Sequence, residues 1–159
     1  GDRAWIVVPA EETGVERDIV FSEADIQTLL LSKGAVYAGF TVLLETAGLD
    51  FSVVERFLIS GGFGQHLNIE RAVTIGLLPD VARDKFTYLG NSAVAGAYMA
   101  LLSEKHRTEA SKICRAMTYV DFSSNTKFMD EFTSALFLPH TNIKQFPSVK
   151  IPQSRAAGR

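Results

Sequence analysis

Hydrophobic residues form two short runs at the start of the chain and a long helical pattern after them. The runs 5–8 and 18–21 are rich in β-branched and aromatic residues and flank a polar loop, so they predict a β-hairpin. A long helix is predicted over 23–47, because Ser22 is a suitable N-cap and Gly48 follows the last apolar position. The chain therefore opens with a hairpin that leads directly into a helix.

One face of this helix carries a lysine among apolar residues. The predicted stripe is Ile26, Leu29, Leu30, Tyr37, Phe40, Leu44 and Ala47. Lys33 lies in the middle of it, so either its stem extends to a surface or its ammonium reaches a cleft beside the core. Gly34 and Gly39 each weaken a helix by about 1 kcal/mol relative to alanine. We therefore expect another element to pack closely against them.

Strands and helices alternate after the long helix. Strands are predicted within 53–60, at 86–89 and at 117–122, and helices at 68–75, from 92 to about 104, within 110–115 and at 125–137. This order predicts an α/β fold with a mixed sheet and flanking helices. We expect one domain over 1–150 and a disordered polar tail over 151–159.

Composition narrows the class of protein. The chain has 159 residues, 47% of them hydrophobic, and a formal net charge of −2, which suits a single globular domain. No basic patch stands out, so nucleic acid is not an expected partner. The apolar runs are too short to span a membrane, and no signal peptide is recognisable. We expect a cytoplasmic protein whose natural chain begins before Gly1.

Cysteine and histidine usage limits redox and metal chemistry. Cys114 is the single cysteine, so the chain can form neither an internal disulfide nor an all-cysteine iron–sulfur cluster by itself. We expect Cys114 to be a small buried residue on a helix. His66, His106 and His140 are far apart and lack metal-ligand spacing, so surface or capping positions are expected and no metal site is predicted.

Two glycine-containing junctions between a strand and a helix are the candidate binding elements. They cover 60–64 and 90–93. In open α/β sheets, ligands bind outside the carboxyl ends of the strands. Gly61, Gly62 and Gly64 would present backbone N–H groups and open space, which suits the sugar and phosphates of a nucleotide. A tight turn without a ligand fits the spacing equally well.

The common sequence signatures of nucleotide and nucleophile sites are incomplete. No Gly-Lys-Ser/Thr follows the glycines, and Leu67 occupies the third glycine position of a dinucleotide fingerprint. Asp80 follows a proline and is interpreted as a turn residue rather than a ribose ligand. No Gly-x-Ser-x-Gly elbow is present either. The sequence therefore identifies no catalytic residue.

The helix that follows Gly90 carries small residues on neighbouring faces. They are Ala93, Gly96, Ala97 and Ala100. Small side chains allow another helix or domain to approach closely. Ordinary core packing and a docking or hinge surface are both consistent with this pattern.

Four segments together resemble a known superfamily. The stretch 57–64 resembles the adenosine motif of the acetate kinase, sugar kinase, Hsp70 and actin superfamily, and 88–97 resembles its second connecting helix at the hinge between lobes. More closely, the chain resembles the C-terminal region of the reductive activators of corrinoid proteins. The matching stretches are 25–26 with 32–35, 60–67 with 75–79, 89–97, and 135–140.

The resemblance implies a ribonuclease H-like, actin-like ATPase lobe that binds ATP with magnesium. The adenosine and phosphates would lie against Gly61, Gly62 and Gly64, preceded by Ser60. Lys33 matches a helix position that directs a polar side chain at the adenine or ribose. By the same resemblance, Gly90 and Asn91 would lie near the hinge.

The resemblance also implies that other parts of the site lie outside this chain. The phosphate-binding hairpin belongs to the preceding lobe, and the iron–sulfur cluster belongs to an N-terminal domain. The chain is expected to form one wall of an ATP site and to carry no electron carrier.

Three functions stay open at this point. The first, which the resemblance implies, is a lobe of an ATP-dependent activator that supports reduction of cob(II)alamin to cob(I)alamin in a corrinoid protein or corrinoid methyltransferase. Alternatively, it is an interaction or homodimerisation scaffold with little nucleotide chemistry. The third alternative is a lobe of a sugar or acid kinase.

Overall fold

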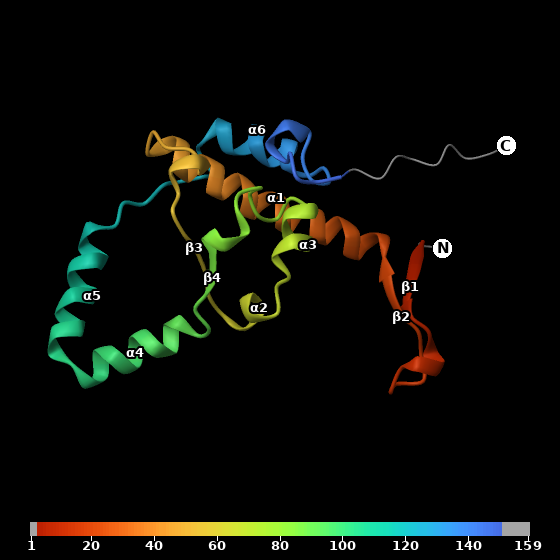
Figure 1. The fold of residues 1–159 in the computed structure, drawn as a ribbon, viewed down its shortest axis with the longest axis horizontal. Helices are drawn as coiled ribbons and strands as arrows, with labels where there is room; N and C mark the ends of the chain where they lie inside the picture. Colours follow the sequence, from red (N-terminus) through yellow and green to blue (C-terminus); the bar gives the residue numbers. More distant parts are fainter. Residues whose placement is uncertain (1–2, 151–159) are drawn as a thin grey trace.

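A computed structural model describes residues 3–150 (Figure 1). The regular elements are β1 (Ala4–Val8), β2 (Ile19–Ser22), α1 (Glu23–Thr46), β3 (Phe57–Ile59), α2 (Gly62–Gln65), α3 (Ile69–Thr74), β4 (Phe86–Tyr88), α4 (Ser92–Leu102), α5 (Glu104–Ala116) and α6 (Thr126–Ala135). Short 3-10 turns occur at Ala10–Glu12, Phe51–Val53, Arg83–Lys85 and Ile143–Gln145. The predicted tail over 151–159 lies outside the described residues.

The predicted hairpin is confirmed. β1 pairs with β2 in an antiparallel ladder that places Trp5 opposite Phe21 and Ile6 opposite Val20, with a bulge beyond Ile6. Trp5 and Ile6 are 54% and 61% exposed although they point to opposite faces of the strand. The hairpin therefore presents apolar side chains on both of its faces.

A capping box starts α1 where the sequence predicts it. The Ser22 hydroxyl accepts a hydrogen bond from the backbone N–H of Asp25 at 3.2 Å, and the Asp25 carboxylate accepts one from the N–H of Ser22 at 2.8 Å. The helix ends at Thr46, and Gly48 follows in the left-handed region with φ 70°.

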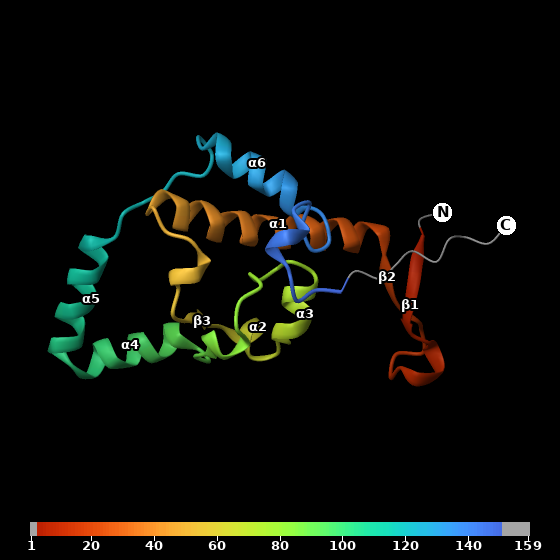
Figure 2. The ribbon, with the colours of Figure 1, turned by 45° about the horizontal axis from the view of Figure 1, so that its top comes forward.

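α1 and α6 lie along each other and form the main helix pair of the fold (Figure 2). The buried face of α1 consists of Lys33, Gly34, Tyr37, Ala38, Gly39 and Val42. A Cβ atom on Gly34 would lie 3.3 Å from Leu136 Cδ2, which confirms the close packing predicted there. The predicted stripe is partly wrong, since Leu29 is 37% exposed. α1 is apolar around its circumference, so packing rather than periodicity selects the buried face.

The hydrophobic core lies between α1, α3, the parallel strands and the C-terminal segment. Its buried members are Tyr37, Ala72, Val73, Leu78, Phe86, Ala135 and Phe146. The Tyr37 ring connects several parts of this core, because its centroid lies 5.9 Å from that of Phe51 and 5.4 Å from that of Phe146.

The described strands form two separate pairs. β3 and β4 are parallel, with Phe57 opposite Phe86 and Ile59 opposite Tyr88, and they do not pair with the hairpin. The described strands thus form two small sheets instead of the single mixed sheet predicted from the sequence. The strand predicted at 117–122 is wrong: this segment has no regular structure, and Tyr119 is 85% exposed. No described strand pairs with it, so its β-type composition has no ladder to join.

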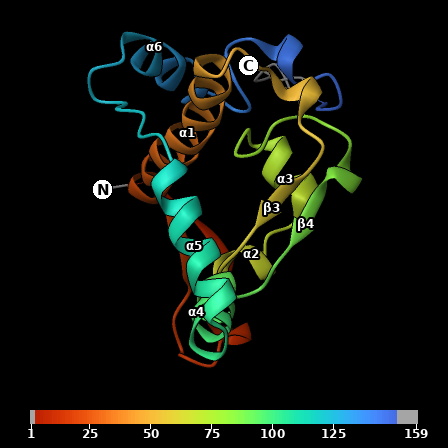
Figure 3. The same ribbon diagram turned by 90° about the vertical axis from the view of Figure 1, so that its left-hand side faces the viewer.

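Helices α4 and α5 form an arm that stands apart from the core in Figures 1 and 2, and Figure 3 views the molecule from the side of this arm. The two helices contact each other, and neither has a buried residue. Cys114 is consequently exposed on α5, which corrects the prediction of a buried cysteine. Ser103 ends α4 and caps α5 by accepting a hydrogen bond from the His106 N–H.

Among the described residues, α1 is long and apolar enough by length and composition to cross a membrane. Its length of 24 residues exceeds any uninterrupted apolar run in it, which explains the difference from the sequence-based expectation. In the structure α1 packs against α6, as the core helix of a folded domain does, and the side chain of its Lys33 is fully buried.

Candidate functional site at the ends of the parallel strands

The two glycine junctions lie side by side at the carboxyl ends of β3 and β4. The parallel ladder continues one step past the strands, because the Leu89 N–H donates to Ile59 O and the Gly61 N–H donates to Gly90 O, both at 2.8 Å. The structure thus joins two sequence-predicted segments that are far apart in the chain. It also places them at the edge where α/β sheets bind ligands.

Gly61 and Gly62 form an open backbone surface at this edge. Gly61 has φ 93° and ψ 166°, a conformation that is accessible to glycine alone. Apart from the adjacent residues in the chain and the backbone of α2, no atom lies within 4 Å of a Cβ built on either residue. Side chains therefore do not fill the space above these two glycines, and a ligand can approach the main chain directly.

Gly64 and Gly90 shape the same corner for different reasons. A Cβ on Gly64 would lie 2.6 Å from Ile59 Cγ2, so glycine is required for α2 to turn back against β3. Gly90 has φ 66°, and a Cβ there would lie 3.3 Å from the side-chain nitrogen Nε2 of Gln65. These two glycines hold the corner in shape.

Polar side chains fix the entry into α4. The Asn91 side-chain oxygen accepts a hydrogen bond from the Val94 N–H at 3.1 Å and so caps the helix. The Ser60 hydroxyl lies 2.5 Å from the Ser92 hydroxyl and donates to Gly90 O at 3.3 Å. Ser92 lies within the predicted junction 90–93 but was not among the predicted site residues, although a serine directly after Gly-Asn at a strand–helix junction is a usable signal.

A small, mainly apolar pocket adjoins α2. It has a volume of about 290 Å³ and is lined by Phe63, His66, Leu67, Asn68, Arg71, Ala72 and Ile75. Phe63 is 77% exposed beside it. A larger polar hollow of about 440 Å³ lies between the end of α1 and the start of α6, and it is lined by none of the predicted site residues.

Lys33 is not directed into a cleft. Its side chain is fully buried, and its ammonium donates hydrogen bonds to the carbonyl oxygens of Phe137 and of Pro139, the latter at 2.7 Å. Burial lowers the pKa of Lys33 to about 8. Both of the expected positions for this side chain are therefore corrected: the ammonium reaches neither the surface nor a cleft, because α6 and the turn after it cover that face of α1.

A second buried polar group lies beside Lys33. His140 is 6% exposed, which corrects the expectation of a surface histidine, and its Nδ1 accepts a hydrogen bond from the Asn142 N–H at 3.0 Å. The Nε2 atom lies 3.3 Å from Glu131 Oε1. Burial and the neighbouring Lys33 charge lower the pKa of His140, and burial raises the pKa of Glu131. The geometry suits a neutral imidazole with its proton on Nε2.

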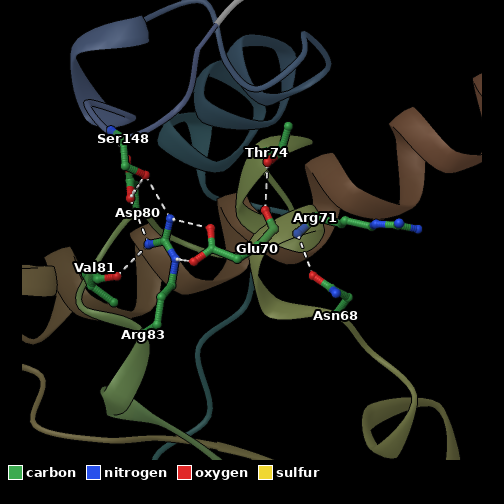
Figure 4. A network of polar contacts seen from close by, with 8 residues as sticks. All are labelled: Asn68, Glu70, Arg71, Thr74, Asp80, Val81, Arg83 and Ser148. Carbon is green, nitrogen blue, oxygen red and sulfur yellow. Dashed lines mark hydrogen bonds and ion pairs between the residues drawn. The ribbon is translucent and has the colours of Figure 1, made fainter.

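Asp80 belongs to a polar network that holds the C-terminal segment (Figure 4). Its carboxylate accepts hydrogen bonds from the Ser148 N–H and hydroxyl, both at 2.7 Å, and from the Arg83 guanidinium at 2.9 Å. Arg83 also pairs with Glu70 at 3.0 Å. Burial opposes ionisation of Asp80, but the bonds from Ser148 and Arg83 outweigh it and lower its pKa. Asp80 is thus a turn residue with structural partners, as the sequence indicated.

The comparison with known protein families decides the class of this domain. Residues 1–150 match the family described as the C-terminal domain of RACo, the ASKHA domain. The chain belongs to this family. The chain is also 31% identical over 130 residues to the corrinoid activation enzyme RamQ of Eubacterium limosum, and the match covers 82% of this chain and 22% of that protein.

A solved structure agrees with this assignment. It is named as a reductive activator for corrinoid, iron-sulfur protein, and it matches this chain with a TM-score of 0.86 and 49% identity. The match covers 92% of this chain and 23% of the other. The predicted superfamily and fold class are thereby confirmed, and the chain spans less than a quarter of the length of each of these two relatives.

Proposed function

We propose that this chain is the C-terminal nucleotide-binding lobe of an ATP-dependent reductive activator of corrinoid proteins. The observation that carries the proposal is the open main chain at Gly61 and Gly62, at the carboxyl ends of two parallel strands. The names of the two relatives support an activator rather than a sugar or acid kinase.

Six of the predicted residues make up the proposed site. Gly61 and Gly62 offer the surface for the nucleotide, Gly64 and Gly90 shape it, and Ser60 and Asn91 fix the two turns. Lys33 is left out, because its ammonium is bound to main-chain carbonyls. ATP would bring magnesium with it, and the remaining walls of the site would come from other parts of the protein.

The proposed reaction is a one-electron reduction of cob(II)alamin to cob(I)alamin in a corrinoid protein or corrinoid methyltransferase. The electron would come from an iron–sulfur cluster in another domain of the activator. The contribution of this lobe is to bind ATP. A cytoplasmic location stays a prediction.

The test compares two glycine-to-alanine variants of the full-length protein. Gly62→Ala places a methyl group in the space proposed for the nucleotide, whereas Gly14→Ala places one in open space in the hairpin loop. We expect both variants to unfold at nearly the wild-type temperature. Titration calorimetry with ATP and magnesium should show an affinity loss of about tenfold for Gly62→Ala alone, or about 1.4 kcal/mol.

Two results would contradict the proposal. One is a wild-type protein that binds no nucleotide. The other is equal affinity in Gly62→Ala and Gly14→Ala.

The exposed arm favours a second candidate function, an interaction or homodimerisation scaffold. α4 is apolar on all sides, yet Val94, Tyr98 and Leu101 are 63%, 63% and 79% exposed. Sedimentation of the full-length protein and pull-down with a corrinoid protein test this candidate. A strict monomer that captures no corrinoid protein would remove it.

A further inference from the structure

Two serine hydroxyls meet at the point where the glycine turns touch. Ser60 directly follows β3, and Ser92 is the first residue of α4. Their oxygens are 2.5 Å apart, although the residues are 32 positions apart in the chain. We propose that Ser60 and Ser92 are positioning residues, which hold the two turns in the geometry that a nucleotide would require; this consequence for binding rests on the proposed function.

The direction of the hydrogen bonds follows from the number of protons. Each serine hydroxyl has one proton to donate. The Ser60 hydroxyl donates to Gly90 O at 3.3 Å, so the Ser92 hydroxyl is the donor in the bond between the two serines. The bonds therefore run in one direction, from α4 through Ser60 to the carbonyl of Gly90.

This arrangement acts on the residue that forms the open surface. Gly61 follows Ser60 and donates its N–H to the same carbonyl of Gly90 at 2.8 Å. Gly61 has φ 93° and Gly90 has φ 66°, so both turns have conformations that other residues rarely adopt. α2 has only four residues and adds little rigidity of its own. The backbone bond from Gly61 to Gly90 links the two turns, and the serine pair adds a second link through side chains.

The experiment uses Ser60→Ala, Ser92→Ala, the double variant and Ser92→Thr in the full-length protein. The first readout is amide hydrogen exchange of the peptide that contains Gly61, which needs no nucleotide. Ser92→Ala removes the bond between the serines, and we expect it to speed this exchange about fivefold. Ser60→Ala also removes the bond to Gly90 O and should speed it at least as much. The double variant should match Ser60→Ala, since Ser92 acts through Ser60. Ser92→Thr keeps the hydroxyl and should restore wild-type exchange.

Ser32→Ala is the matched control. It removes a hydroxyl that donates to Thr28 O at 2.8 Å on an exposed part of α1. Exchange at Gly61 should be unchanged in this variant. The second readout is the affinity for ATP with magnesium, which should fall about threefold to tenfold in Ser60→Ala and Ser92→Ala and recover in Ser92→Thr.

The outcomes separate this proposal from the proposed function. Unchanged exchange at Gly61, or effects of the two single changes that multiply in the double variant, would overturn the positioning role. A loss of ATP affinity without faster exchange would also overturn it and would indicate direct contact with the ligand. If the wild-type protein binds no nucleotide, the proposed function fails, while the exchange measurement still decides the role of the serine pair.

Discussion

The ammonium nitrogen of Lys33 lies 2.7 Å from the carbonyl oxygen of Pro139, a residue 106 positions later in the chain. The same ammonium bonds the carbonyl of Phe137, just beyond the end of α6. Both carbonyls lie in the turn that follows α6, outside the hydrogen-bond ladder of the helix. Lys33 therefore fastens the turn after α6 to the middle of α1.

Replacing Lys33 should weaken the domain strongly. Lys33→Met keeps the shape of the side chain but leaves the buried carbonyl of Pro139 and the partly buried carbonyl of Phe137 without their donor. We therefore expect the free energy of unfolding to fall by about 2–3 kcal/mol. Chemical denaturation of the full-length protein, monitored in this domain, measures the change. Lys112→Met is the control, because the Lys112 side chain is 71% exposed on α5. If the two variants were equally stable, the buried ammonium would have no net structural role.

His140 should make the domain sensitive to mild acid. Its pKa is lowered in the folded state by burial and by Lys33, so the imidazole stays neutral while the unfolded chain takes up a proton near pH 6.5. Stability from this residue is therefore present above pH 6.5 and is lost as the pH falls below it.

The measurement compares wild type with His140→Gln between pH 7.5 and pH 5, in buffers that span that range. Glu131, Tyr37 and Lys33 face His140 in both proteins, so the difference between them reports the histidine. We expect wild type to lose up to about 1.4 kcal/mol per pH unit relative to the variant below pH 6.5. His106→Gln, an exposed position on α5, should follow wild type. Parallel curves for wild type and His140→Gln would disprove the assignment.

Asp80 should contribute to stability through its partners in the C-terminal segment. Asp80→Ala leaves the Ser148 N–H without its acceptor and removes one of the carboxylate partners of Arg83, which keeps Glu70. The Asp80 side chain is only 3% exposed. We expect a loss of about 2 kcal/mol at neutral pH. Because folding lowers the pKa of Asp80, its stabilising contribution is complete at pH values above the pKa of an unfolded aspartate, near 4. The contribution is lost as the pH falls from there through the lower pKa of the folded state.

Thermal unfolding at pH 7 and at pH 3 tests both parts of this prediction. Asp84→Ala is the matched control, because Asp84 is exposed in the neighbouring turn. A difference between the Asp80 and Asp84 variants that persisted unchanged at pH 3 would contradict the role of the carboxylate charge.

Interactions between residues close in sequence determined much of the local structure of this protein. The capping box at Ser22 and Asp25, the hairpin, and the glycine junctions at 60–64 and 90–93 depend on residues that are close in sequence, so their patterns were readable. The four ordered segments were also sufficient to indicate the family.

Only the tertiary structure decided which of these features meet. The Lys33 ammonium bonds carbonyls more than 100 residues away, and the Ser60 hydroxyl meets Ser92 across two turns. Neither contact has a local sequence signal, because each depends on how α1, α6 and the parallel strands pack. Packing likewise buries His140 and leaves 117–122 without a strand partner, although composition favoured the opposite for both.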